Sequence, residues 1–142
     1  MIDIRLLTSK DELVLHNLGP EVFDNKINTQ LTQEFLSDPR HHLVVALDSD
    51  LVVGMASGVH YVHPDKPPQM FINEVGVSPS HRGQGIGRSL VSALVERARQ
   101  LNCTEAWVLT DAENTSAMHM YAAAGGFQDG KPQAMFTIPI SR

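Results

Sequence analysis

The strongest chemical signal in the sequence is a glycine-rich stretch, Arg82-Gly83-Gln84-Gly85-Ile86-Gly87-Arg88. Its three glycines carry no side chains, so backbone N–H groups in this stretch can approach a bulky anion. A helix that begins here adds unpaired first-turn amides and the positive end of its dipole. The arginines at both ends supply positive charge. The residue types and their order therefore predict a pyrophosphate-binding loop.

Two better-known phosphate-binding patterns do not fit this loop. The Walker pattern requires a lysine followed by serine or threonine, and the dinucleotide-binding pattern requires G-x-G-x-x-G. After Gly83 and Gly85, the position of the third glycine holds Arg88. Since neither pattern is present, we rank a nucleotide-binding domain below the functional alternatives that are described below.

Glu74 is a second candidate for chemistry, because it interrupts a mostly apolar run that leads toward the loop. Residues 70–77 read Met-Phe-Ile-Asn-Glu-Val-Gly-Val and predict a strand. Burying a carboxylate without partners is costly, so we expect a partly buried group that accepts a proton from a substrate. The alternative is a glutamate that is salt-bridged or exposed at a strand edge.

The loop and its context resemble the pyrophosphate motif of the GCN5-related N-acetyltransferases, Q/R-x-x-G-x-G/A. Arg82, Gly85 and Gly87 occupy the fixed positions of this motif, after a predicted strand and before a long amphipathic helix. A second match, residues 114–121, is similar to the family's N-x-x-A-x-x-x-Y helix, and Gly126-Phe127 is similar to the G-F turn behind it.

The resemblance implies that acetyl-CoA is the co-substrate and that its acetyl group passes directly to an amine in a ternary complex. By position, Glu74 accepts the amine proton directly or through water, the Val75 amide stabilises the oxyanion, and Tyr121 protonates the departing thiolate. No Cys-His or Ser-His pair that would form an acyl-enzyme is apparent. The implied cofactor contacts are Val75, Val77, Arg82, Gly83, Gln84, Gly85, Gly87, Arg88, Asn114, Ala117 and Tyr121.

Several residues also have simpler structural explanations. Asn114 fits a helix cap, because Asn side chains accept hydrogen bonds from first-turn amides. Tyr121 fits a buried tyrosine whose hydroxyl finds a backbone partner. His119 is expected at the surface and is given no role. Cys103, the single cysteine, is expected to pack as a small apolar residue.

The acceptor is expected to be a small cationic amine. Residues 71–77 and the short chain resemble the compact type I aminoglycoside 3-N-acetyltransferases, whose acceptor cleft is acidic. Glu74 stands where those enzymes usually have Asp, which moves the carboxylate by about a bond length. The acids expected to hold the amine are Asp24, Glu74, Asp111 and Glu113.

Two other functional classes stay open. The enzyme could instead acetylate a protein N-terminus, a lysine or a small polyamine. Alternatively, the chain could be a CoA-binding regulatory module that kept the loop and lost the chemistry. Intact Glu74 and Tyr121 argue against the second alternative.

Composition narrows the class of partner. Sixteen acidic residues against eleven Lys plus Arg give a formal charge of −5, which disfavours nucleic acid and anionic membranes and favours cationic partners. No apolar segment reaches the roughly 20 residues of a membrane span. The first residues lack the features of a secretory signal, so we expect a cytoplasmic protein. No metal is expected, because the single cysteine excludes a multi-cysteine site.

The order of elements predicts one α/β domain over residues 1–142. The resemblance implies a central, mostly antiparallel sheet of about six to seven strands, splayed at the cofactor site and flanked by four helices. A closing strand would leave an edge that a homodimer could use. From their patterns, the strands are expected at 2–7, 42–47, 51–62, 70–77, 105–109 and 134–140, and the helices at 10–18, 27–37, 85–101 and 115–124.

Overall fold

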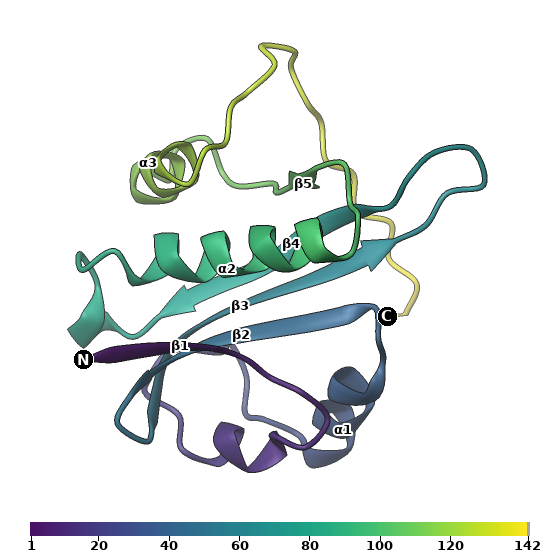
Figure 1. The fold of residues 1–142 in the computed structure, drawn as a ribbon. Coiled ribbons are helices and arrows are strands. Elements are labelled where there is room, and N and C mark those ends of the chain that lie inside the picture. Colours follow the sequence, from purple (N-terminus) through teal and green to yellow (C-terminus); the bar gives the residue numbers. More distant parts are fainter. Residues whose placement is uncertain (142) are drawn as a thin grey trace.

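Strands β2 (His41–Asp48) and β3 (Leu51–Tyr61) are buried on both faces and form the centre of a five-stranded sheet. The computed structural model describes residues 1–141 and gives the strand order β1-β2-β3-β4-β5 (Figure 1). The sequence predicted the mixed architecture correctly, but six to seven strands and four helices were too many. The remaining elements are β1 (Ile2–Leu6), the 3-10 helix η1 (Glu12–His16), α1 (Thr29–Ser37), β4 (Gln69–Val77), the 3-10 helix η2 (Pro79–His81), α2 (Ile86–Gln100), β5 (Ala106–Trp107) and α3 (Thr115–Ala123).

The sheet is mostly antiparallel, as predicted. Strands β1 to β4 pair antiparallel with their neighbours, and only β5 runs parallel to β4. A hairpin joins the predicted strands β2 and β3 through Ser49 and Asp50. Ser49 has a φ of 55°, and a left-handed residue of this kind lets a two-residue turn match the twist of its strands.

The sheet separates two buried cores. On one face, Leu90, Val91 and Leu94 of α2 pack with residues of β2, β3 and β4. On the opposite face, Leu15 and Val22 pack with β2 and β3, and α1 covers them from outside. Figure 1 shows α2 and α1 on opposite sides of the sheet. The apolar positions of α2 recur at helical spacing, so its predicted amphipathic face is confirmed.

Helix α1 begins and ends at local sequence signals. The Asn28 side chain accepts a hydrogen bond from the Leu31 amide at 2.9 Å and so caps the first turn. Asp38 has extended backbone angles and ends the helix, because the residue before Pro39 disfavours the helical region. Within residues 1–141, no helix is long and apolar enough to cross a membrane.

Strands β4 and β5 diverge soon after they meet. They pair only at Met70 with Ala106 and at Phe71 with Trp107. Beyond Phe71, no described strand pairs with this edge of β4, and the chain after β5 leaves the sheet toward α3 (Figure 1). The backbone groups of this edge can therefore face a ligand, as expected for a sheet that splays at its cofactor site.

Two predicted elements are shorter than expected. The helix predicted at 10–18 is only η1, because Leu18 forms a bridge with Val52 of β3 and the chain there becomes extended. The strand predicted at 105–109 is reduced to β5, because the sheet pairing ends at Trp107.

The closing strand predicted at 134–140 is absent. This segment has no strand pairing, and its apolar side chains, including Phe136 and Ile138, are 86% and 78% exposed. Strand β5 offers an edge of only two residues, and Pro139 has no N–H with which to extend a ladder. The alternating apolar pattern therefore has no sheet surface on which to be buried within this chain.

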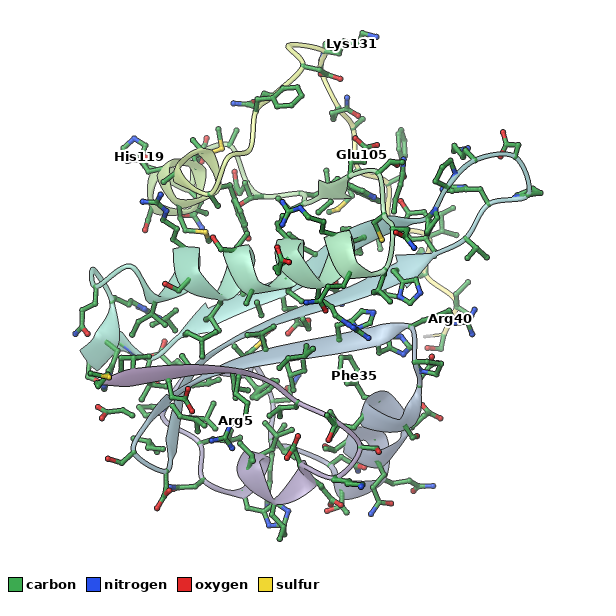
Figure 2. All side chains as sticks on the ribbon, in the orientation of Figure 1. Arg5, Phe35, Arg40, Glu105, His119 and Lys131 are labelled. Atoms are coloured by element: carbon green, nitrogen blue, oxygen red, sulfur yellow. The ribbon has the colours of Figure 1, made fainter. Side chains whose placement is uncertain are left out.

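A hydrogen-bonded histidine pair joins β2 and β3. His42 Nε2 lies 2.8 Å from His60 Nδ1, and the His60 amide donates to the Arg40 carbonyl at 3.0 Å, at the end of the sheet where β2 begins (Figure 2). His42 is only 5% exposed. Burial, with the nearby charges of His60 and Arg97, lowers the pKa of His42 to about 4.

We expect this pair to make the fold sensitive to acid. The unfolded chain protonates His42 near pH 6.5, whereas the folded chain does so only near its pKa of about 4. Stability is therefore complete above pH 6.5 and falls as the pH is lowered toward 4, with a loss of about 2 kcal/mol by pH 5. Urea unfolding at pH 7 and pH 5 measures this loss.

His42→Gln should reduce the loss of stability between pH 7 and pH 5, because glutamine does not titrate. His16→Gln is the matched control, since His16 is exposed on η1. If His42→Gln lost as much stability on acidification as the wild type, the explanation would be wrong.

Candidate active site

The glycine-rich loop has the geometry of an anion-binding site. Gly83 and Gly85 have φ values of 78° and 79°, in the left-handed region that favours glycine. Gly85 precedes α2, and no side chain caps the first turn of this helix. Among the described residues, the amides of residues 83–88 donate no hydrogen bond. Several unpaired N–H groups therefore point outward beside the positive end of a helix dipole.

Arginine side chains add positive charge to the loop. Arg82 Nε donates to the Val77 carbonyl at 3.0 Å, which holds the guanidinium beside the end of β4. Its Nη2 lies 3.8 Å from Glu21 Oε1, in an exposed ion pair that solvent screens. Arg88 projects from the first turn of α2 and lines the same pocket as Arg82.

A pocket of about 1170 Å³ connects this loop with β4, α3 and the segment before α1. Both the loop and Glu74 contribute to its lining. Most of the predicted contacts line it, namely Asp24, Glu74, Val75, Val77, Arg82, Gly83, Gly85, Gly87, Arg88, Asn114 and Ala117. Four predicted site residues, Gln84, Asp111, Glu113 and Tyr121, are absent from the lining.

Glu74 lies in the pocket wall but is exposed, so the expected partial burial is wrong. The register of β3 and β4 shifts at this point, with Ser57 opposite Glu74 and Gly58 opposite Ile72. Asn73 is the extra residue of this bulge, and both Asn73 and Glu74 are turned to solvent. Val75 then returns to the core side, where it packs beside α2 and still lines the pocket.

Tyr121 is half-buried on α3 and packs against the core formed with α2. Burial raises the pKa of its hydroxyl, which therefore stays protonated at neutral pH. Its neighbours on the helix, Met120 and His119, line the pocket instead. Tyr121 was expected beside the cofactor, but it does not line the pocket.

The turn before α3 explains why two predicted acids lie outside the pocket. Asp111 Oδ1 accepts a hydrogen bond from the Glu113 amide at 3.0 Å, and the Asp111 carbonyl accepts one from the Asn114 amide at 2.9 Å. Asp111 therefore builds the turn that leads into the helix. Asn114 Oδ1 accepts from the Ala117 amide at 3.0 Å, which confirms its role as a cap.

Sequence reasoning missed a series of hydrogen-bonded side chains at the entry to the loop. His81 Nε2 lies 2.8 Å from Asp48 Oδ2, and His81 Nδ1 lies 2.8 Å from Ser80 Oγ. No local pattern could reveal it, because Asp48 and His81 are separated by 33 residues. Ser80 does not line the pocket, so this Ser-His pair offers no acyl acceptor there. His81 does line the pocket.

Two further observations bear on the site. His119 projects from α3 (Figure 2) and contributes to the pocket wall, although it was expected only at the surface and without a role. Cys103 is half-buried beside the α2 core, and burial raises the pKa of its thiol, in keeping with the predicted packing role. Within residues 1–141, no group of three His, Cys, Asp or Glu side chains could hold a metal ion.

Known proteins share both sequence and fold with this chain. The mycothiol acetyltransferase of Kocuria rhizophila is 33% identical over 93 residues, which are 62% of this chain and 30% of that protein. The streptothricin acetyltransferase of Streptomyces lavendulae is 31% identical over 100 residues, which are 70% of this chain and 51% of that protein. The matched region thus spans about a quarter to about half of the curated relatives.

A solved structure gives the same fold at lower sequence identity. The aminoglycoside acetyltransferase meta-AAC0020, from an uncultured soil metagenomic sample, superposes with a TM-score of 0.81 at 18% identity and covers 97% of both chains. The model of the acetyltransferase (GNAT) family matches residues 11–127, which include the loop, β4 and α3. The chain therefore belongs to the acetyltransferase (GNAT) family.

Proposed function

We propose that this protein is an acetyl-CoA-dependent N-acetyltransferase that acts on a small cationic amine. The main support for this proposal is that one pocket is lined both by the loop, with its unpaired amides and its arginines, and by the Glu74 carboxylate. The loop suits the pyrophosphate of acetyl-CoA, and the carboxylate suits an amine that must lose a proton.

The cofactor fits the pocket by its chemistry. Arg82, Arg88 and the amides of residues 83–88 match the two phosphate charges, and the open edge of β4 beyond Phe71 can hydrogen-bond the amide-containing pantetheine arm. A Cβ atom at Gly83 or Gly85 would meet nothing within 4 Å, so the space in front of both glycines is open. Bound acetyl-CoA supplies the acetyl thioester.

In the proposed reaction, Glu74 accepts a proton from the amine, directly or through water. The neutral amine nitrogen then forms a bond to the acetyl carbon and loses a second proton, the carbon–sulfur bond breaks, and the sulfur receives a proton, so that one proton is released overall. The Val75 amide is the proposed oxyanion donor. Tyr121 is the proposed proton donor to the sulfur. Its hydroxyl holds its proton at neutral pH, and burial raises its pKa further.

An aminoglycoside is the acceptor that we favour, with transfer to its 3-amino group. Three carboxylates in the pocket wall, those of Glu21, Asp24 and Glu74, provide negative charge for a polycation. Related folds support the substrate class, because meta-AAC0020 has also been solved with sisomicin, and its fold superposes on this one with a TM-score of 0.78. The aminoglycoside N-acetyltransferase AAC(6')-Iy shares the fold at a TM-score of 0.75. A cytoplasmic location is part of the same proposal.

Release of CoA thiol tests this function directly. The purified protein is given acetyl-CoA with aminoglycosides, polyamines, peptide amines and amino acids that carry a side-chain amine. We expect turnover with aminoglycosides, a fall in kcat of about 100-fold in Glu74→Gln, and a smaller fall in Tyr121→Phe. Glu34→Gln is a matched control, because Glu34 lies on α1 and does not line the pocket.

Turnover of another amine class alone would contradict the aminoglycoside proposal and keep the acetyltransferase. Binding of acetyl-CoA without turnover of any amine would instead favour a CoA-binding module. Mass spectrometry of the product locates the acetylated nitrogen, and a product modified at another amine would contradict 3-N transfer.

Gly85→Ala tests the loop separately from the chemistry. Alanine at a φ of 79° costs about 1 kcal/mol of backbone strain and turns the loop amides away from the anion. We expect the Kd for CoA to rise about ten-fold in isothermal titration calorimetry. Gly130→Ala is the matched control, since Gly130 has a φ of 81°, has open space at its Cβ position and lies outside the pocket. Equal weakening by both variants would contradict a role for the loop amides.

A further inference from the structure

The residue immediately before the anion-binding loop is bonded to another part of the fold. His81 Nε2 lies 2.8 Å from Asp48 Oδ2, and its Nδ1 lies 2.8 Å from Ser80 Oγ. One neutral tautomer satisfies both contacts, because Nε2–H donates to the carboxylate while Nδ1 accepts from the Ser80 hydroxyl. The His81 side chain is only 18% exposed. Its ring is therefore fixed at both nitrogens and largely shielded from water.

The loop itself has few other means of keeping one conformation. The amides of residues 83–88 have no acceptor within the described chain, and Gly83 and Gly85 add no side-chain contacts. Arg82 is bonded to the Val77 carbonyl only five residues earlier, and its ion pair with the distant Glu21, at 3.8 Å, is exposed and screened by solvent. Neither contact holds the loop firmly to a distant element. The contact between His81 and Asp48 is the side-chain hydrogen bond that joins the loop entry to the β2–β3 hairpin.

Asp48 is placed on a rigid support. It is the last residue of β2 and pairs with Ile2 of β1 and with Leu51 of β3. The left-handed Ser49 directly after it fixes the turn. The backbone of Asp48 is held on both sides by strands, and its side chain, although 45% exposed, can therefore define where His81 lies, directly before the loop.

We propose that Asp48 and His81 are positioning residues, which fix the direction of the loop amides and thereby set the affinity for the pyrophosphate of acetyl-CoA. This inference rests on the proposed function, because it assumes that the loop binds that group. Preorganised donors bind an anion more tightly than donors that must first be ordered, since the ordering cost is already met in the free protein. Loss of the pair should therefore weaken pyrophosphate binding without changing the chemistry at Glu74.

The test compares ligands with and without the pyrophosphate. For Asp48→Ala and His81→Ala, we expect the KM for acetyl-CoA and the Kd for CoA to rise about five-fold, with kcat unchanged. With S-acetylpantetheine, which lacks the pyrophosphate, kcat/KM should equal that of the wild type. Asp48→Asn keeps an acceptor for His81 and should change the Kd less than two-fold. The double variant should bind CoA no more weakly than whichever single variant binds it more weakly, because both substitutions remove the same contact.

Asp50→Ala is the matched control, since it removes the same charge from the same hairpin, and CoA binding should not change. Urea unfolding of each variant shows that the fold is retained. Unchanged CoA binding in both alanine variants, or an equal loss with S-acetylpantetheine, would overturn the positioning role. Failure of the wild type to bind CoA would instead overturn the proposed function, so the two failures are distinguishable.

Discussion

The site depends on keeping a row of backbone amides unpaired and directed at one region of space. Such groups are costly when they have no acceptor, so a protein retains them only where a ligand or water meets them. Here the turn between β4 and α2 presents the amides of residues 83–88 to an open pocket. Glycines at the left-handed positions make this backbone path accessible.

The rest of the fold supports this arrangement from two sides. Helix α2 is fixed by its apolar face on the sheet, which sets the direction of its first turn. On the other side of the loop, Ser78 is buried, its amide donates to the Val53 carbonyl and its hydroxyl donates to the Pro20 carbonyl at 2.6 Å. This second bond also ties the end of β4 to the segment that carries Glu21 and Asp24. The anion-binding and carboxylate-lined parts of the pocket are thus joined by the same short stretch of chain.

Local patterns predicted the parts of the site that local interactions build. The Asn114 cap and the apolar face of α2 depend on residues within one or two turns of each other, and both are confirmed. The glycine loop has left-handed glycines, and its binding of a pyrophosphate stays a prediction. Non-local features were beyond this reasoning. The exposure of Glu74 follows from a register shift between β3 and β4, and the bond from His81 to Asp48 spans 33 residues. The strand pattern at 134–140 was misleading because a strand also needs a partner edge, which β5 provides over only two residues.

The most direct test of the account observes the loop amides themselves. In an NMR titration of the labelled protein with CoA, the amide resonances of residues 83–88 should show the largest shifts, because their N–H groups gain charged acceptors. Resonances of the 134–140 segment should stay unchanged. Shifts confined to regions outside the loop, or no shifts at saturating CoA, would contradict the central claim that this loop binds the pyrophosphate of acetyl-CoA.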